Sequence, residues 1–137
     1  MSRFDRCLRH VLRWEGGLGD HAADPGGITN LGISLRFLEA NRLDIDGDGD
    51  VDADDVRSLD LARAGSIYHA VIWDGVYDQL SDERGACSVF DMDVNMGERR
   101  AHPIAQRATA YLGEPVLMDG KAIVLIPYAL VSARLFR

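Results

Sequence analysis

The chain has 137 residues, 47% of them hydrophobic, so it can bury one core, and we expect no second one. It contains no apolar run of 18 residues and no hydrophobic segment near its start, which argues against a membrane-spanning helix and against signal-dependent export. The formal net charge of -7 comes from one aspartate-rich segment, and the balanced charge elsewhere excludes the domain-wide positive field that nucleic-acid binders need.

The first predicted element is a helix over residues 4–15. Its hydrophobic side chains fall within about 100° of one another on a helical wheel, whereas its arginines point the other way. Glu15 lies on the apolar side, and Gly16 and Gly17 end the helix directly after it. Burial and the negative end of the helix dipole both favour the protonated form of a carboxyl at this place, which makes Glu15 a candidate proton donor. The alternative is a helix-end glutamate that turns out to solvent.

Cys7 in this helix and Cys87 are the two cysteines of the chain. They are isolated in the sequence and show no C-x-x-C spacing. We therefore expect buried free thiols, in preference to a disulfide or a metal pair.

A turn is predicted next, because residues 24–27 read Asp-Pro-Gly-Gly, and a new ordered stretch begins at Thr29. Asp24 and Thr29 are thus brought back on a tight loop after Glu15. Inverting glycosidases need an acid on one side of the sugar and a base or water-holding group on the other, with the carboxyl groups about 6.5 to 9.5 Å apart. Asp24 and Thr29 are therefore candidate catalytic partners of Glu15. His21 is either a solvated loop histidine or a further catalytic group.

The aspartate-rich segment covers residues 44–55. Seven carboxylates lie within twelve residues, without Lys or Arg among them, and repel one another unless a cation or loop disorder relieves them. Oxygen donors stand at positions 1, 3, 5, 7, 9 and 12, with glycine at position 6 and valine at position 8, as in an EF-hand calcium loop. The expected metal ligands are Asp44, Asp46, Asp48, Asp50, Asp52 and Asp55.

Position 12 of this loop is Asp55, where the EF-hand consensus has glutamate. The shorter side chain reaches an ion with one oxygen or through water, so we expect weakened calcium affinity and stronger competition from magnesium. Calcium does not lower the pKa of water as zinc does, so its predicted role is a structural clamp, and no cofactor is expected for catalysis. The clamp would join a helix over residues 35–43 to one over residues 59–72. The alternative is a solvated acidic linker that binds nothing.

Apolar residues recur at intervals of three or four residues through most of the remaining chain. This spacing predicts a mainly α fold, with short extended pieces within residues 26–34. Tyr68 and Trp73 supply aromatic surface suited to stacking on sugar rings, although for Trp73 a place in the core is the preferred alternative. Asp91 and Asn95 are four residues apart and share a helix face. They either line a substrate cleft or serve as helix caps and buried hydrogen-bond partners.

Four ordered blocks resemble the family 108 glycoside hydrolases, which are lysozyme-like N-acetylmuramidases, often phage or prophage endolysins. The blocks are E-G-G at 15–17, D-P-G-G-x-T-x-x-G-I at 24–33, I-Y with W-D at 67–74, and F-D-x-x-V-N-x-G at 90–97. The resemblance implies a lysozyme-like helical domain with a small β-hairpin beside the cleft, and it makes Glu15 the catalytic acid. The order Glu15, Asp24, Thr29 is also similar to phage-type lysozymes, although the threonine comes one residue sooner here.

The chain departs from the family pattern at two places. Residues 18–23 lack the aromatic and the proline that relatives commonly carry there, and Asp119-Gly120 is not followed by the G-P-x-T of the family's peptidoglycan-binding segment. The resemblance therefore implies a muramidase domain at residues 1–112, which includes the loop 44–55. Residues 113–137 would form a C-terminal helical segment, a reduced or truncated peptidoglycan-binding region.

The function that the resemblance implies is hydrolysis of the β-1,4 bond between N-acetylmuramic acid and N-acetylglucosamine in peptidoglycan. The alternative is a calcium-dependent wall-binding protein, or a regulator of secretion or lysis, that keeps the scaffold without turnover. The expected partners are peptidoglycan glycan strands and a holin-type release partner, with no nucleic acid, no stable membrane insertion and a monomeric state. The protein would be made in the cytoplasm and act in the periplasm or on the cell wall.

Overall fold

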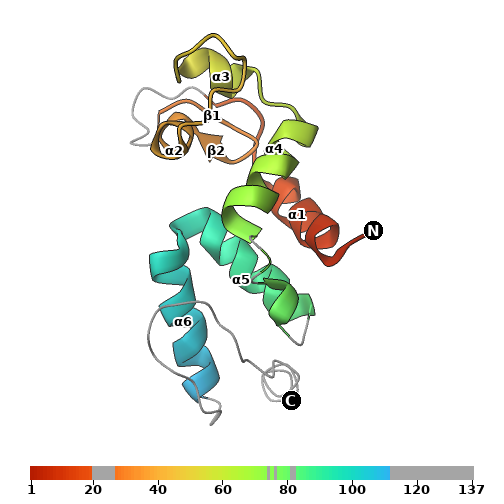
Figure 1. Cartoon of the computed structure of the whole chain (residues 1–137). Helices are drawn as coiled ribbons and strands as arrows, with labels where there is room; N and C mark the ends of the chain where they lie inside the picture. Colours follow the sequence, from red (N-terminus) through yellow and green to blue (C-terminus); the bar gives the residue numbers. More distant parts are fainter. Residues whose placement is uncertain (20–26, 74, 76, 81–82, 112–137) are drawn as a thin grey trace. The chain divides into compact units, whose positions relative to one another are not determined.

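The computed structural model describes residues 1–19, 27–73, 75, 77–80 and 83–111 (Figure 1). The predictions for Asp24, His21 and the C-terminal segment 113–137 lie outside the described residues. The chain divides into two compact units, one made of residues 11–68 and the other of residues 1–10 with the chain from residue 69 onward. Within the described residues the fold is mainly α with one small antiparallel hairpin, so the predicted fold class is confirmed.

The unit of residues 11–68 begins with the last turn of helix α1, which continues into it from the other unit. Its elements are α1 (Arg3–Trp14), β1 (Thr29–Asn30), β2 (Ile33–Ser34), α2 (Leu35–Asn41), α3 (Ala53–Arg57) and α4 (Leu61–Ile67). Each of α1, β2, α2, α3 and α4 contributes a buried hydrophobic side chain, namely Val11, Ile33, Leu38, Val56 and Ala64. Burial of apolar surface from the whole length of this segment holds its short elements together.

The hairpin has a two-residue loop. Thr29 pairs with Ser34 and Asn30 pairs with Ile33. The loop residues Leu31 and Gly32 both have positive φ, 52° and 77°, as a type I′ turn requires, and glycine meets that requirement without steric cost. The side-chain amide of Asn30 donates to the carbonyl oxygens of Val56 and Leu59, at 3.0 and 3.1 Å. These bonds attach the hairpin to the end of α3.

The helices on either side of the acidic loop are shorter than predicted. The predicted helix 35–43 ends at Asn41, because Arg42 takes a left-handed conformation with φ of 55°. The predicted helix 59–72 is replaced by α4 and a π-helical segment, η1 (Tyr68–Trp73), and the short helix α3 precedes it. Asp52 and Asp60 set the starts of α3 and α4, since the side chain of each caps the N-terminus of its helix.

The other unit contains the first turns of α1 and the elements after residue 68. These are η1, a 3-10 turn η2 (Tyr77–Gln79), α5 (Glu83–Met96) and α6 (Glu98–Tyr111). Its core is a cluster of aromatic rings from α1, η1, η2 and α5, with edge-to-face contacts whose centroids lie 5.3 to 6.1 Å apart. The rings are Phe4, Trp73, Tyr77 and Phe90. Between α5 and α6, Gly97 has a φ of 78° and ends the first helix.

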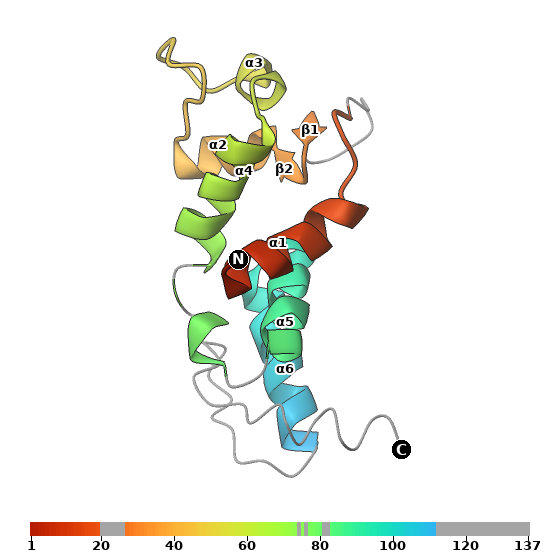
Figure 2. The ribbon, with the colours of Figure 1, turned by 90° about the vertical axis from the view of Figure 1, so that its right-hand side faces the viewer.

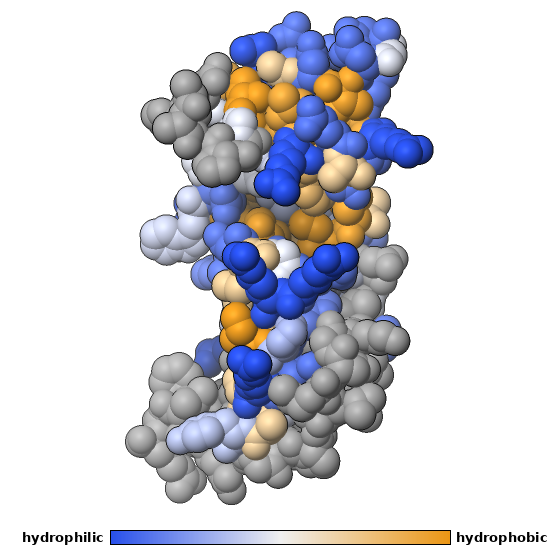
Figure 3. All heavy atoms as spheres, turned by 90° about the vertical axis from the view of Figure 1, so that its left-hand side faces the viewer, coloured by the Kyte–Doolittle hydropathy of each residue, from blue (hydrophilic) through white to orange (hydrophobic). Residues whose placement is uncertain are grey.

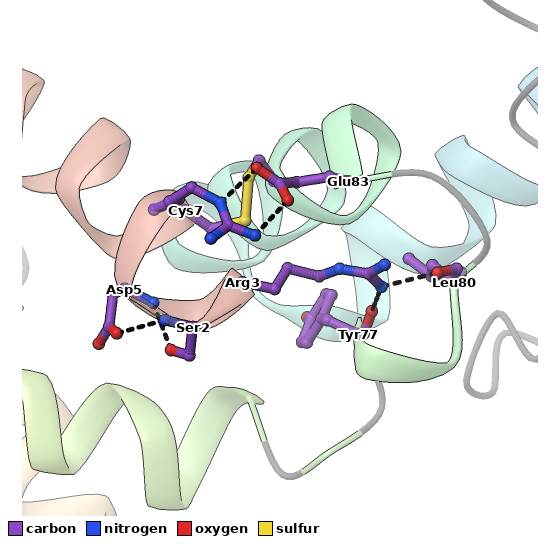
Figure 4. Close-up of a disulfide and its surroundings, with 9 residues drawn as sticks. Ser2, Arg3, Asp5, Cys7, Tyr77, Leu80 and Glu83 are labelled. Atoms are coloured by element: carbon purple, nitrogen blue, oxygen red, sulfur yellow. Dashed lines mark hydrogen bonds and ion pairs between the residues drawn. A yellow bond between two sulfur atoms is a disulfide. The ribbon is translucent and has the colours of Figure 1, made fainter.

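Cys7 and Cys87 form a disulfide between α1 and α5, with their Cα atoms 4.7 Å apart (Figure 4). The prediction of free thiols is therefore wrong. The spacing in the sequence could not reveal the pair, because 80 residues separate the two cysteines and only the packing of α1 on α5 brings them together. Beside the disulfide, the guanidinium of Arg6 contacts both carboxylate oxygens of Glu83, at 2.7 and 2.5 Å. Figure 2 shows α1 crossing α5 in the unit that they share.

The surface mixes hydrophobic and hydrophilic side chains. On the face drawn in Figure 3, orange hydrophobic patches are interrupted by dark blue charged residues. The most exposed large hydrophobic side chains are scattered over the fold, with Trp14 on α1, Leu61 on α4 and Tyr111 on α6. Among the described residues, no helix combines the length and the hydrophobicity needed to span a bilayer.

Candidate active site

Glu15 lies directly after the end of α1. Its backbone N–H donates to the carbonyl oxygen of Val11 at 3.1 Å, so the residue continues the hydrogen-bond ladder of the helix. The side chain is half-buried, neither sealed in the core nor free in solvent. The amphipathic pattern of α1 accounts for this position, because Val11 is buried one turn earlier on the same face.

The hairpin turn and the start of η1 meet the Glu15 side chain. Tyr68 is buried, with 1% of its surface exposed, and its hydroxyl donates to the carbonyl oxygen of Leu31 at 2.9 Å. A methyl group added at Gly32 would lie 2.5 Å from the Tyr68 hydroxyl oxygen and 3.0 Å from both Cγ and Cδ of Glu15. The carboxyl group and the hydroxyl oxygen therefore approach the same face of the turn, and only glycine leaves room for both.

The electrostatics of this contact keep the tyrosine neutral. Burial raises the pKa of Tyr68 well above its usual range, and the negative charge of Glu15 adds to the rise. The hydroxyl therefore stays protonated at any pH at which the protein works, and its hydrogen is directed at Leu31. A neutral hydroxyl in a largely buried environment thus lies next to the Glu15 side chain.

Thr29, the predicted partner of Glu15, lies in β1 of the same unit. Its backbone pairs with that of Gly19 through two hydrogen bonds of 2.8 Å, and a methyl group at Gly19 would lie 3.3 Å from the Thr29 hydroxyl oxygen. The stretch just after Glu15 is thereby bound to the hairpin. Asp24, the other predicted partner, is outside the described residues.

Of the residues predicted to bind substrate, Tyr68 lies beside Glu15, and Trp73, Asp91 and Asn95 belong to the other unit. Trp73 is fully buried, its indole N–H donates to Asp78 at 2.9 Å, and its ring belongs to the aromatic core. Tyr68 is buried as well. Stacking on a sugar needs an open ring face, so neither ring fits that prediction, and Trp73 takes the core position that was its alternative. In α5, the Asn95 side chain donates to the carbonyl oxygen of Asp91, a bond within one helix.

A buried polar cluster in the unit of α5 and α6 was not foreseen. The Tyr77 hydroxyl donates to the Asp93 carboxylate, and the His102 Nε2 atom lies 3.5 Å from the same carboxylate oxygen. All three side chains are buried. The burial and the Asp93 interactions raise the pKa of Tyr77 above its usual range. Helical periodicity gave no signal for this cluster, because its members come from η2, α5 and α6.

The acidic loop gathers its carboxylates in two groups. The carboxylate oxygens of Asp44, Asp46 and Asp48 lie within 4.8 Å of one another, and the same limit holds for Asp50, Asp52 and Asp55. Asp55 differs from the rest because it is buried and accepts hydrogen bonds from the backbone amides of Ile45, Asp46 and Asp52, at 2.5, 3.2 and 2.7 Å. The last position of the loop thus ties the two ends of the loop together.

Like charges perturb the exposed members of the loop. The charges of Asp48 and Asp52 are the main cause that raises the pKa of Asp50. Desolvation raises the pKa of Asp46, and the neighbouring carboxylates raise it further. Burial pushes the pKa of Asp55 upward, but its three amide partners outweigh burial and the pKa lies below its usual value. A cation at the exposed carboxylates would relieve this repulsion.

Comparison with known proteins places the chain in a family. The model of the family described as glycosyl hydrolase 108 matches residues 8–97, which include Glu15, the hairpin, the acidic loop and Tyr68. A solved structure, "Structure of Brucella abortus SagA", is 29% identical and covers 98% of this chain and 70% of that chain, with a TM-score of 0.65. Among curated proteins, none matches. The predicted lysozyme-like helical fold is confirmed, and the chain belongs to the glycosyl hydrolase 108 family.

Proposed function

We propose that this protein is a peptidoglycan hydrolase that cleaves the β-1,4 bond between N-acetylmuramic acid and N-acetylglucosamine, with Glu15 as the general acid. Membership of a glycosyl hydrolase family supports the reaction class. The observation that carries the assignment is the half-buried carboxyl of Glu15, held against Gly32 and the neutral hydroxyl of Tyr68. Partial removal from water is an environment that disfavours the charged form of a carboxyl, as the role of general acid requires.

In the proposed reaction Glu15 gives its proton to the O4 atom of N-acetylglucosamine as the bond from C1 of N-acetylmuramic acid to that oxygen breaks. Positive charge develops at C1 and the ring oxygen. Water adds to C1 and loses a proton to a base. Asp24 is the candidate for that base, and the hydroxyl of Thr29 is the candidate for holding the water. The products are a new N-acetylmuramic acid reducing end and a free O4 hydroxyl.

The test is the identity of the reducing ends. Peptidoglycan incubated with the purified protein is reduced with borohydride, hydrolysed and analysed for amino-sugar alcohols. We expect the alcohol of muramic acid to increase with time. An increase in the alcohol of glucosamine would assign the other glycosidic bond. Protein that pellets with the wall without new reducing ends would favour the wall-binding alternative.

We also propose that the loop 44–55 binds calcium as a structural ion. The two groups of carboxylates and the raised pKa values of Asp46 and Asp50 support a cation at this place. A ligand present at a hundred times its Kd stabilises a fold by about 2.7 kcal/mol. We therefore expect calcium to raise the Tm relative to chelator, by several degrees for a chain of this size.

The calcium proposal has a matched pair of variants. Asp48→Asn removes one negative charge inside the loop, and Glu39→Gln removes one from an exposed position on α2. The shift of Tm with calcium should shrink in Asp48→Asn and persist in Glu39→Gln. A wild-type Tm that is the same with calcium and with chelator would contradict the proposal.

A further inference from the structure

The contact between Tyr68 and the hairpin turn lies directly behind Glu15. Tyr68 has its ring buried and its hydroxyl hydrogen directed at the Leu31 carbonyl. Because the ring offers no open face, stacking on a sugar does not explain this tyrosine. The hydroxyl, in contrast, touches the segment on which the Glu15 side chain rests.

The turn holds an uncommon backbone conformation at Leu31. Leu31 has a φ of 52°, a conformation that side chains larger than glycine, asparagine or aspartate rarely adopt. The hydrogen bond from Tyr68 is made to this residue's own carbonyl group. Gly32 is the next residue. The side of its α-carbon on which a side chain would stand faces both the Tyr68 hydroxyl and the Glu15 carboxyl. The hydroxyl, the turn and the carboxyl form one chain of contacts.

We infer that Tyr68 is a positioning residue, whose hydroxyl fixes the Leu31–Gly32 turn as the support that holds the Glu15 carboxyl in place for proton transfer. The inference rests on the proposed function. It assigns no contact between Tyr68 and the substrate. The hydroxyl donates to the Leu31 carbonyl oxygen, so its proposed effect on Glu15 passes through the turn.

The test replaces Tyr68 with phenylalanine, which removes the hydroxyl and keeps the ring. Without the hydroxyl the Glu15 carboxyl is displaced, so the transition state is less well stabilised while the sugars still bind. We therefore expect kcat on soluble glycan strands to fall about tenfold to a hundredfold, and KM to change by less than about twofold. Tyr111→Phe is the control, because Tyr111 is 91% exposed and the same atom is removed. It should keep wild-type kcat and KM.

A second variant approaches the contact from the turn. In Gly32→Ala, the added methyl group would press on both the Tyr68 hydroxyl and the Glu15 side chain, so the same fall in kcat with little change in KM is expected. Both variants are compared at equal folded fraction, measured by circular dichroism at the assay temperature. If kcat in Tyr68→Phe equals that of the wild type, or if the variant does not fold, the positioning role is overturned. If the wild type itself releases no reducing ends, the proposed function fails as well.

Discussion

Replacing Glu15 with glutamine is expected to lower the rate of peptidoglycan hydrolysis by about 10²- to 10⁴-fold, the contribution that a positioned acid or base commonly makes. Glutamine has the shape of glutamate and can fill the same space against Gly32, but it has no acidic proton to give to the leaving oxygen. The rate is measured as new reducing ends per enzyme with time. The structural expectation is an unchanged Tm, because the packing of the side chain on the turn is preserved.

The matched control for this variant is Glu39→Gln, which makes the same chemical change at an exposed position on α2. It should retain the wild-type rate. Full activity in Glu15→Gln would remove Glu15 from the role of acid and leave the family assignment intact. A loss of activity together with a large fall in Tm would mean that the carboxylate serves the fold, since the amide cannot replace it there.

Loss of the Cys7–Cys87 disulfide is expected to lower the free energy of unfolding by about 4 to 5 kcal/mol, because the cross-link closes a loop of about 80 residues in the unfolded chain. The unfolding midpoint in urea is compared for the oxidised protein, for the protein with reductant, and for a variant with both cysteines changed to alanine. Alanine is preferred to serine at Cys7 because that side chain is fully buried and a hydroxyl there would need a partner.

The reductant and the alanine variant separate two effects. Reduction opens the cross-link and removes no side-chain atom, so its main effect is the lost entropic contribution. The alanine variant removes the sulfur atoms too, and its stability should be lower still by the cost of the space left behind. Its midpoint should not respond to reductant. If the wild type has the same urea midpoint with and without reductant, the expected contribution of the disulfide is contradicted.

Periodicity of hydrophobic residues predicted the part of the site that depends on one element. Within α1, the spacing of apolar residues places Val11 and Glu15 on one face, and the structure puts Glu15 at the half-buried end of that helix. The small hairpin also follows from local chemistry, because Gly32 can take the positive φ that its turn needs. Local signals of this kind act over a few residues and can be read from the sequence.

Contacts between distant elements could not be predicted in this way. Tyr68 lies 37 residues from the carbonyl that it binds, and the disulfide spans 80 residues. An aromatic residue near a proposed site is equally consistent with a sugar platform and with core packing, and only the surroundings of Trp73 decide between them. Helix boundaries after the acidic loop were missed because aspartates there act as N-caps, a use that the metal-ligand pattern does not distinguish.

The covalent link between α1 and α5 also connects the fold to the oxidation state of its surroundings. In a compartment where glutathione and thioredoxin keep thiols reduced, such a bond does not persist, whereas an oxidising compartment forms and retains it. Since Cys7 lies inside α1 (Arg3–Trp14), about two turns before Glu15, the disulfide anchors the helix that leads to the proposed acid. The folded state would therefore be less stable in a reducing compartment, where the cross-link is lost, than in an oxidising one, where it is kept.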